Sequence, residues 1–142
     1  MQLKKLYHQD LNLWRQEVVN AIQNQRLENM DWDNLIDEIN DMTASERRAL
    51  RSYTKRLIEH ILKLKFWHRE KDYNQRSWKK EVVNFREEIK NILLDSPSLN
   101  NYLAENYQDW YAKSVKAMRQ EFTIPEDNSV DLEIIMTEEY FG

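Results

Sequence analysis

Apolar and polar positions alternate along much of this sequence with the period of an α-helix. The most apolar stretch runs from Leu57 to Trp67. On a helical wheel turned by about 100° per residue, its apolar side chains cover well over half of the circumference. Such a helix is normally buried among other helices. At about 11 residues it is too short to cross a bilayer, which needs roughly 20. We therefore expect this stretch at the centre of a helical bundle.

The same periodicity predicts four long helices, over about residues 10–26, 44–67, 77–94 and 97–122, and two short ones, over about 31–42 and 129–136. Four of these helices have a candidate capping residue at their start: Asp10, Asp31 or Asp33, Ser96 before Pro97, and Ser129. The helix over 31–42 is amphipathic, and we expect its apolar side to be formed by Leu35, Ile36, Ile39 and Met42.

The boundary at Thr43 has two interpretations. Residues 43–46, Thr-Ala-Ser-Glu, match a capping box, which predicts that one helix ends and another restarts at Ala44. In the alternative the helix is unbroken, and Glu46 then shares a stripe with Ile39, Leu50, Tyr53 and Leu57 and faces the core. We take the break as the prediction.

The composition favours an all-α protein. The only glycine is Gly142, and the only prolines are Pro97 and Pro125, so phosphate-binding glycine loops, dinucleotide fingerprints and nucleophile elbows are excluded. The absence of cysteine excludes disulfides, zinc–thiolate sites and thiol catalysis. Residues 1–142 are predicted to form a single helical domain. Charges interrupt residues 1–14, so no signal peptide is expected there, and we expect a cytoplasmic protein that does not enter a membrane.

The net charge of −4 is unevenly distributed. Residues 28–46 contain seven acids and no base, residues 63–80 contain seven bases and two acids, and the chain after Arg119 contains seven acids and no base. A basic middle therefore lies between two acidic segments, a pattern that bears on binding partners more than on the fold.

Several short motifs, taken together, carry a family resemblance. They are Asn34-Leu35-x-x-Glu38-Ile39-x-Asp41, Glu46-Arg47-x-x-Leu50, Leu57-x-x-His60-x-Leu62-Lys63, Ser77-Trp78 and Ser96-Pro97-Ser98-Leu99. Their order and spacing resemble the bacterial, largely cyanobacterial, domain-of-unknown-function family 29 over nearly the whole chain. The resemblance implies a compact all-helical domain. It implies no activity, and it supplies no catalytic residues.

A cluster of polar residues is the first candidate site: Glu38, Asp41, Glu46, Arg47 and His60. Carboxylates and an imidazole on neighbouring helices can bind a metal or catalyse proton transfer. The Glu-x-x-His pair of di-iron bundles is absent, however, and His60 falls within the apolar arc, where it needs a hydrogen-bond partner. We therefore favour a structural network over a metal or catalytic site, and expect no cofactor.

The basic middle segment is the second candidate. Its cations, which alternate with Trp67, Tyr73 and Trp78, include Lys63, Lys65, Arg69, Arg76, Lys79 and Lys80. Cations can follow a phosphate backbone while exposed aromatic rings stack on bases. The alternative is that both tryptophans anchor the core. A sequence pI near 5.5 argues against a dedicated nucleic-acid-binding protein.

The acidic segment 121–139, together with Tyr140 and Phe141, leaves two possibilities open. Its apolar residues either dock on the bundle or offer a patch to a partner, and its acids could equally pair with the basic middle segment. A small helical protein without glycine loops, cysteine or a distinct site favours a non-catalytic interaction or regulatory module with a protein partner. An enzyme or ligand-binding protein that uses the cluster around His60 is the alternative, and weak nucleic-acid binding by residues 63–80 is the next.

Overall fold

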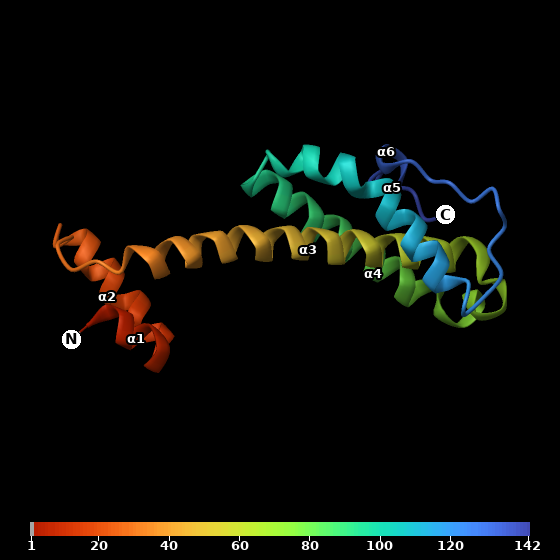
Figure 1. The fold of residues 1–142 in the computed structure, drawn as a ribbon. Helices are drawn as coiled ribbons and strands as arrows, with labels where there is room; N and C mark the ends of the chain where they lie inside the picture. The colour runs from red at the N-terminus through yellow and green to blue at the C-terminus, as the bar shows by residue number, and fades with distance from the viewer. Residues whose placement is uncertain (1) are drawn as a thin grey trace. The chain divides into compact units, whose positions relative to one another are not determined.

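The computed structural model describes residues 2–142 and is all-α, as the sequence predicts (Figure 1). Helices make up 76% of it, and no strand occurs within residues 2–142. Four helices are long and two are short, although the predicted short helix over 31–42 is part of a long one. No helix in this part of the chain is long and apolar enough to span a membrane. The helices are α1 (Leu3–Gln9), α2 (Leu11–Gln23), α3 (Trp32–Phe66), α4 (His68–Asp95), α5 (Leu99–Met118) and α6 (Leu132–Ile135).

Two compact units make up the described residues, one over 2–45 and one over 46–142, and the division falls within α3. The prediction of a single domain stays a prediction. The net charge divides unequally between the units. Residues 2–45 contain four bases and eight acids, whereas residues 46–142 contain seventeen of each. The first unit therefore carries the whole net charge of −4.

The unit over residues 2–45 has a small core. α1 and α2 pack against each other, and the buried apolar residues are Leu6, Trp14, Val18 and Met30. Asp10 caps α2 as predicted, because its side chain accepts from the main-chain N–H of Leu13 at 3.0 Å. α2 ends at Gln23 rather than at residue 26. The sequence pattern missed α1, because seven residues contain too few apolar positions to define a period.

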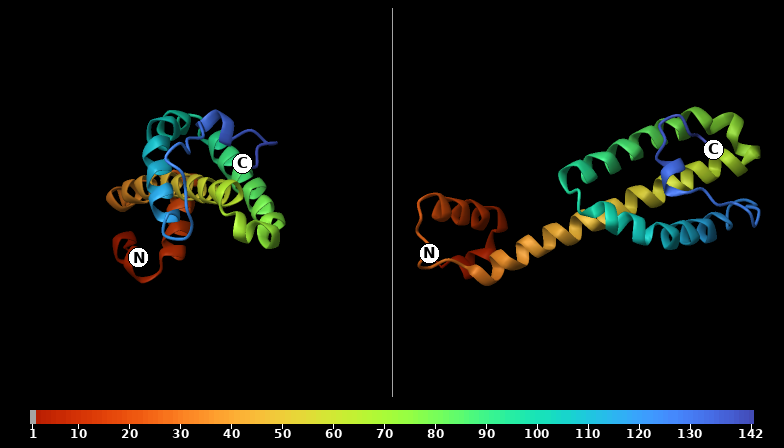
Figure 2. Two further views of the ribbon diagram at one scale, coloured as in Figure 1. Left: turned by 90° about the vertical axis from the view of Figure 1, so that its right-hand side faces the viewer. Right: turned by 90° about the horizontal axis from the view of Figure 1, so that it is seen from above.

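The unit over residues 46–142 contains the main core. Its α3 residues Leu57, Ile58, Ile61, Leu62 and Leu64 are at most 1% exposed, which confirms that this apolar stretch is buried. α4 and α5 run alongside this part of α3, and the segment after α5 returns across them (Figure 2). A domain of this size buries enough apolar surface to fold without disulfides or metals.

The predicted break at Thr43 is wrong, because α3 runs from Trp32 to Phe66 without interruption. A capping residue must leave helical geometry, whereas Thr43 lies within the helix and donates its hydroxyl to the carbonyl of Ile39 at 3.4 Å. No Gly or Pro stops propagation there, and Ala44 and Glu46 both favour helix. The alternative of an unbroken helix is therefore the correct one, and Glu46, which that alternative turns toward the core, is half-buried.

Two other boundaries differ from the prediction. α4 begins at His68 rather than near Ser77, because the charged segment between them contains no helix-breaking residue. The turn from α3 to α4 is the single residue Trp67, whose ring stacks on Trp78 at 5.8 Å and on Phe122 at 4.9 Å between centroids. Ser96 ends α4 instead of capping α5, which begins at Leu99. The short last helix is confirmed, although it spans only Leu132–Ile135.

Candidate functional site

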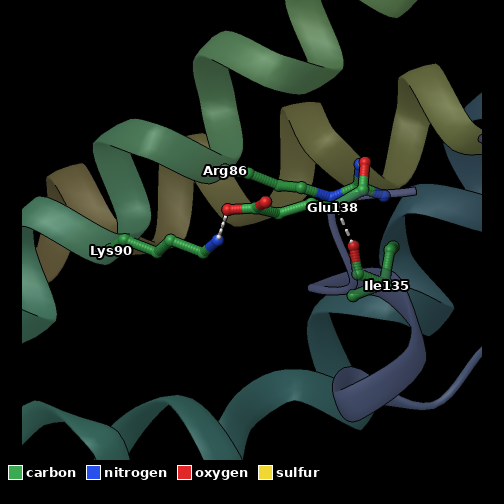
Figure 3. Close-up of polar contacts among 4 residues, drawn as sticks. All are labelled: Arg86, Lys90, Ile135 and Glu138. Atoms are coloured by element: carbon green, nitrogen blue, oxygen red, sulfur yellow. Dashed lines mark hydrogen bonds and ion pairs between the residues drawn. The ribbon is translucent and has the colours of Figure 1, made fainter. Parts of the chain in front are cut away.

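Arg86 is buried on α4, at 2% exposure, although arginine is rarely buried without a partner. Its guanidinium donates Nε–H to the carbonyl of Ile135 at 2.8 Å and Nη1–H to the carbonyl of Glu138 at 3.2 Å (Figure 3). Nη2 donates to the carbonyl of Tyr140, and the cation lies 5.4 Å from the centroid of the Phe141 ring. No carboxylate pairs with it within residues 2–142. One side chain thus satisfies three main-chain carbonyls of the C-terminal segment.

The surroundings of Arg86 are electrostatically balanced. Burial lowers the pKa of Arg86, while the hydrogen bond from Lys90 lowers the pKa of Glu138. Lys90 Nζ lies 2.8 Å from Glu138 Oε1 at the surface (Figure 3). A hollow of about 570 Å³ adjoins these residues, and its charged lining is Arg86, Lys90, Glu87 and Glu138. Two cations and two carboxylates give the hollow no preference for an anion or a cation.

Two tyrosines of α5 hold the loop between α5 and α6. The hydroxyl of Tyr107 donates to the carbonyl of Val130 at 2.6 Å, and that of Tyr111 donates to the carbonyl of Asn128. Burial raises the pKa of both phenols, that of Tyr111 to about 12. Val130 and Ile135 are themselves 5% and 0% exposed. Of the two possibilities for the acidic tail, the structure therefore supports docking on the protein's own core.

The predicted polar cluster does not gather around one point in either unit. In residues 2–45, Glu38 pairs with Arg15 at 3.6 Å, and Asp41 is exposed without an ion pair. In residues 46–142, Arg47 lies 5.0 Å from the centroid of the Tyr102 ring, and it forms no ion pair with Glu46. Within the described chain, no three side chains of the metal-binding types converge.

His60 has its own structural partner. Its Nδ1 lies 2.9 Å from the carbonyl of Arg56, so this nitrogen carries the proton and donates. The ring meets Phe85 edge-on, with 5.2 Å between centroids. Burial is the main cause that lowers the pKa of His60, so the neutral form is favoured. These contacts favour the structural interpretation of His60. A catalytic role for the cluster stays a prediction.

The six candidate cations of the basic segment divide into two sets. Three lie near aromatic rings of the same unit: Lys63 near Trp78, Lys65 near Phe66 and the Tyr140 hydroxyl, and Lys79 near Phe141. The other three, Arg69, Arg76 and Lys80, are exposed and make no ion pair within residues 2–142. Trp67 and Trp78 stack on each other and pack against the core, which favours the anchoring interpretation of the tryptophans.

Tyr73 differs from the two tryptophans, because its side chain is 87% exposed. On a helical wheel it shares one side of α4 with Arg69, Arg76 and Lys80, at the i, i+3 and i+4 spacings that place helix residues next to one another. We call these four residues the outer α4 face. Three cations and one aromatic ring of the candidate nucleic-acid-binding segment are therefore exposed to solvent on this face.

Several large apolar side chains are exposed on the first part of α3, where the sequence pattern indicated a buried side. Trp32, Ile36, Ile39 and Met42 are 50%, 54%, 54% and 63% exposed. We call these four residues the exposed α3 stripe. Only Leu35 of the expected apolar side packs against the small core of residues 2–45. The periodicity identified three of the four positions, but it could not reveal that nothing within residues 2–45 covers them.

Asp31 is a buried carboxylate that the sequence interpretation treated only as a possible cap. Its Oδ2 accepts from the indole Nε1–H of Trp14 at 3.2 Å and from the amide of Asn34 at 2.7 Å. Its Oδ1 has no donor among residues 2–142. Its carbonyl accepts from the N–H of Leu35 at 3.0 Å, so Asp31 also leads the chain into α3. The bonds to Trp14 and Asn34 hold the start of α3 against α2.

Comparison with known proteins gives one match. The family model described as "Domain of unknown function DUF29" matches residues 6–141, which is nearly the whole chain. No curated protein and no solved structure gives a significant match.

Proposed function

Because the chain belongs to the DUF29 family, whose description names no activity, we propose a function from its own surface: the protein is a non-catalytic interaction module that binds another protein through the exposed α3 stripe. One observation carries the proposal. Four large apolar side chains on a single helix are each at least half exposed. Contiguous apolar surface of this kind marks protein–protein contact sites, whereas isolated exposed apolar residues do not.

The rest of the molecule supports a binding role over a catalytic one. Glu38, Arg47 and His60, members of the polar cluster, have structural partners, and the hollow beside Arg86 has a balanced lining. The acidic segment docks on its own core, so it is not free to act as an arm for a partner. A cytoplasmic location is part of the same proposal, and fractionation of the host cell tests it.

Site-specific photo-crosslinking in the host cell tests the interaction. A benzoylphenylalanine at position 39 should give one adduct of defined mass, and the purified adduct partner should bind the wild-type chain but not an Ile36→Ser/Ile39→Ser variant. The matched control places the same residue at Leu94 on α4, which is 77% exposed. Adducts of equal yield and identity from both positions, or none from position 39, would reject the proposal.

Nucleic-acid binding is the second candidate function, and the exposure of Tyr73 between Arg69 and Arg76 is the observation that favours it. A ring beside cations on one helix side suits a single strand, because the ring stacks on a base while the cations contact phosphates. We expect the chain to bind single-stranded RNA at low salt, and we expect Arg76→Glu to weaken that binding. No binding at about 50 mM salt, where phosphate contacts are strongest, would reject this candidate.

A further inference from the structure

The charge around the exposed α3 stripe specifies the kind of partner that fits it. We propose that the occupant is a cationic amphipathic helix of another protein, which lies along the stripe with its apolar side inward and is attracted by the net charge of −4 of residues 2–45. This inference rests on the proposed function and narrows it to one class of ligand.

The spacing within the stripe indicates a helical partner. Trp32, Ile36 and Ile39 follow the 4 and 3 steps of a helix–helix contact, and Met42 continues it by three more residues. On a wheel at about 100° per residue the four side chains lie within an arc of about 120°, which is the width of a helix-packing side. The stripe covers eleven residues, or about 15 Å at 1.5 Å per residue. A partner helix of about three turns matches that length.

The acids of residues 2–45 indicate a cationic partner, although on the same wheel Asp37 and Asp41 lie on the side of α3 opposite the stripe. Asp37 and Asp41 are exposed and make no ion pair within residues 2–142. The helix dipole explains an acid in the first turn, such as Asp33, but its effect has faded by positions 37 and 41. No base occurs between Arg26 and Arg47. A cationic helix on the stripe is therefore attracted by the net charge of the whole unit, and the long side chains of its lysines and arginines can lie along the apolar surface.

A second copy of this chain fits the stripe less well. A symmetric dimer through the stripe would bring together two units that each carry a net charge of −4, and like charges across an interface oppose association. A cationic helix is instead attracted by the negative charge of the unit, and this attraction raises the rate at which the helix and the unit associate. The charge of the unit therefore distinguishes between the two occupants.

A pair of designed peptides tests the inference with the full chain. The first is a 21-residue helix with leucines at the a and d positions and lysines elsewhere, and the second has glutamate in place of every lysine. A third peptide has the lysine composition in scrambled order. Anisotropy of the labelled peptides should show that the chain binds the lysine helix at least about tenfold more tightly than the other two. Binding should weaken as salt rises from about 50 to 500 mM.

Variants of the chain separate the apolar and the charged contributions. Ile36→Ser/Ile39→Ser should weaken binding of the lysine helix at least about tenfold, because it removes the apolar side chains at the centre of the contact. Asp37→Asn/Asp41→Asn lowers the net charge of the unit from −4 to −2, and it should weaken binding of the lysine helix about threefold and flatten its salt dependence. Leu94→Ser is the matched control and should change nothing, since Leu94 is an exposed apolar residue on α4. Circular dichroism before each titration confirms that every variant is folded.

Three outcomes overturn the inference. The first is equal affinity for the lysine and glutamate helices. The second is no measurable affinity for either, and the third is a sedimentation-equilibrium dimer that Ile36→Ser/Ile39→Ser dissociates. The crosslink from position 39 separates these failures from failure of the proposed function. A hetero-adduct without lysine-helix binding keeps the interaction module and rejects only the cationic helix, whereas absence of any adduct rejects both.

Discussion

The guanidinium of Arg86 donates to the main-chain carbonyl of Ile135, 49 residues later in the sequence, at 2.8 Å. With the carbonyls of Glu138 and Tyr140, it forms a set of three acceptors for one buried cation. Main-chain carbonyls bind the guanidinium whatever side chains surround them. The C-terminal segment is therefore held through its backbone as well as through the burial of Ile135.

Replacing Arg86 should strongly destabilise the unit over residues 46–142. Arg86→Met keeps much of the side-chain volume but leaves three carbonyls without their donor, and each buried unsatisfied acceptor costs about 1–3 kcal/mol. We expect the free energy of unfolding from urea titration to fall by more than about 3 kcal/mol. Lys90→Met removes only an exposed ion pair and should leave the midpoint nearly unchanged. Equal effects of both substitutions would contradict this role of Arg86.

Two neighbouring isoleucines provide a matched test of the docked tail. Ile135 is fully buried, whereas Ile134 is 45% exposed. Ile135→Ala should cost about 2–5 kcal/mol, because it leaves a cavity in the core. Ile134→Ala should stay within about 0.5 kcal/mol of the wild type. Thermal or urea denaturation measures both, and a small effect at position 135 would show that the tail does not contribute to the core in solution.

His60 should make stability depend on pH near neutrality. Its pKa is lower in the folded chain than in the unfolded chain, chiefly because burial disfavours the imidazolium. The unfolded chain therefore binds more protons as the pH falls below about 6.5, and stability should decrease in that direction. The denaturation midpoint should decrease as the pH is lowered from about 7.5 to 5.5, a range that lies above the one in which carboxylates protonate.

The histidine controls assign this effect to one residue. His60→Gln should flatten the pH dependence between about pH 7.5 and 5.5, since glutamine does not titrate. His68→Gln replaces an exposed histidine at the start of α4 and should retain the dependence of the wild type. If the His60 variant keeps the full slope, another group is responsible.

Trp14 should stabilise residues 2–45 through its hydrogen bond as well as its ring. Trp14→Phe removes the donor to Asp31 Oδ2, and loss of a bond to a buried carboxylate costs about 1–3 kcal/mol. Amide hydrogen exchange of peptides from residues 10–31 should become faster, while peptides from residues 57–64 should be unaffected. Trp32→Phe alters a half-exposed indole and serves as the control. Unchanged exchange in residues 10–31 would show that the hydrogen bond from Trp14 to Asp31 does not stabilise this unit.

Periodicity predicted the elements better than it predicted their partners. The burial of Leu57 to Leu64 follows directly from a stretch that is apolar on most sides. The prediction of a break at Thr43 failed because a capping-box sequence without a Gly or Pro beside it does not stop a helix whose flanking residues favour helix. The same pattern placed Ile36 and Ile39 on an apolar side. Whether such a side is covered depends on residues far away in the sequence.

The candidate sites follow the same division. Arg86 falls within the stripe of Val82, Phe85 and Ile89, so a helical wheel could have identified it as a buried cation. Its acceptors could not have been identified, because carbonyls of an irregular segment carry no sequence signature. Likewise, the basic segment was visible as a composition, but only the fold separates Lys63, which lies near a ring, from Arg76, which is exposed.

The Arg86 hydrogen bonds also set the order in which the nascent chain can mature. At a synthesis rate of about 5–20 residues per second, roughly 3–10 s pass between the incorporation of Arg86 and that of Tyr140. Until Ile135 is made, the guanidinium has none of its three acceptors, and the site of Ile135 is open to solvent. The apolar surface of α3, α4 and α5 is then accessible to chaperones. Residues 2–45 have no such delay, since their core is complete once Leu35 has been made.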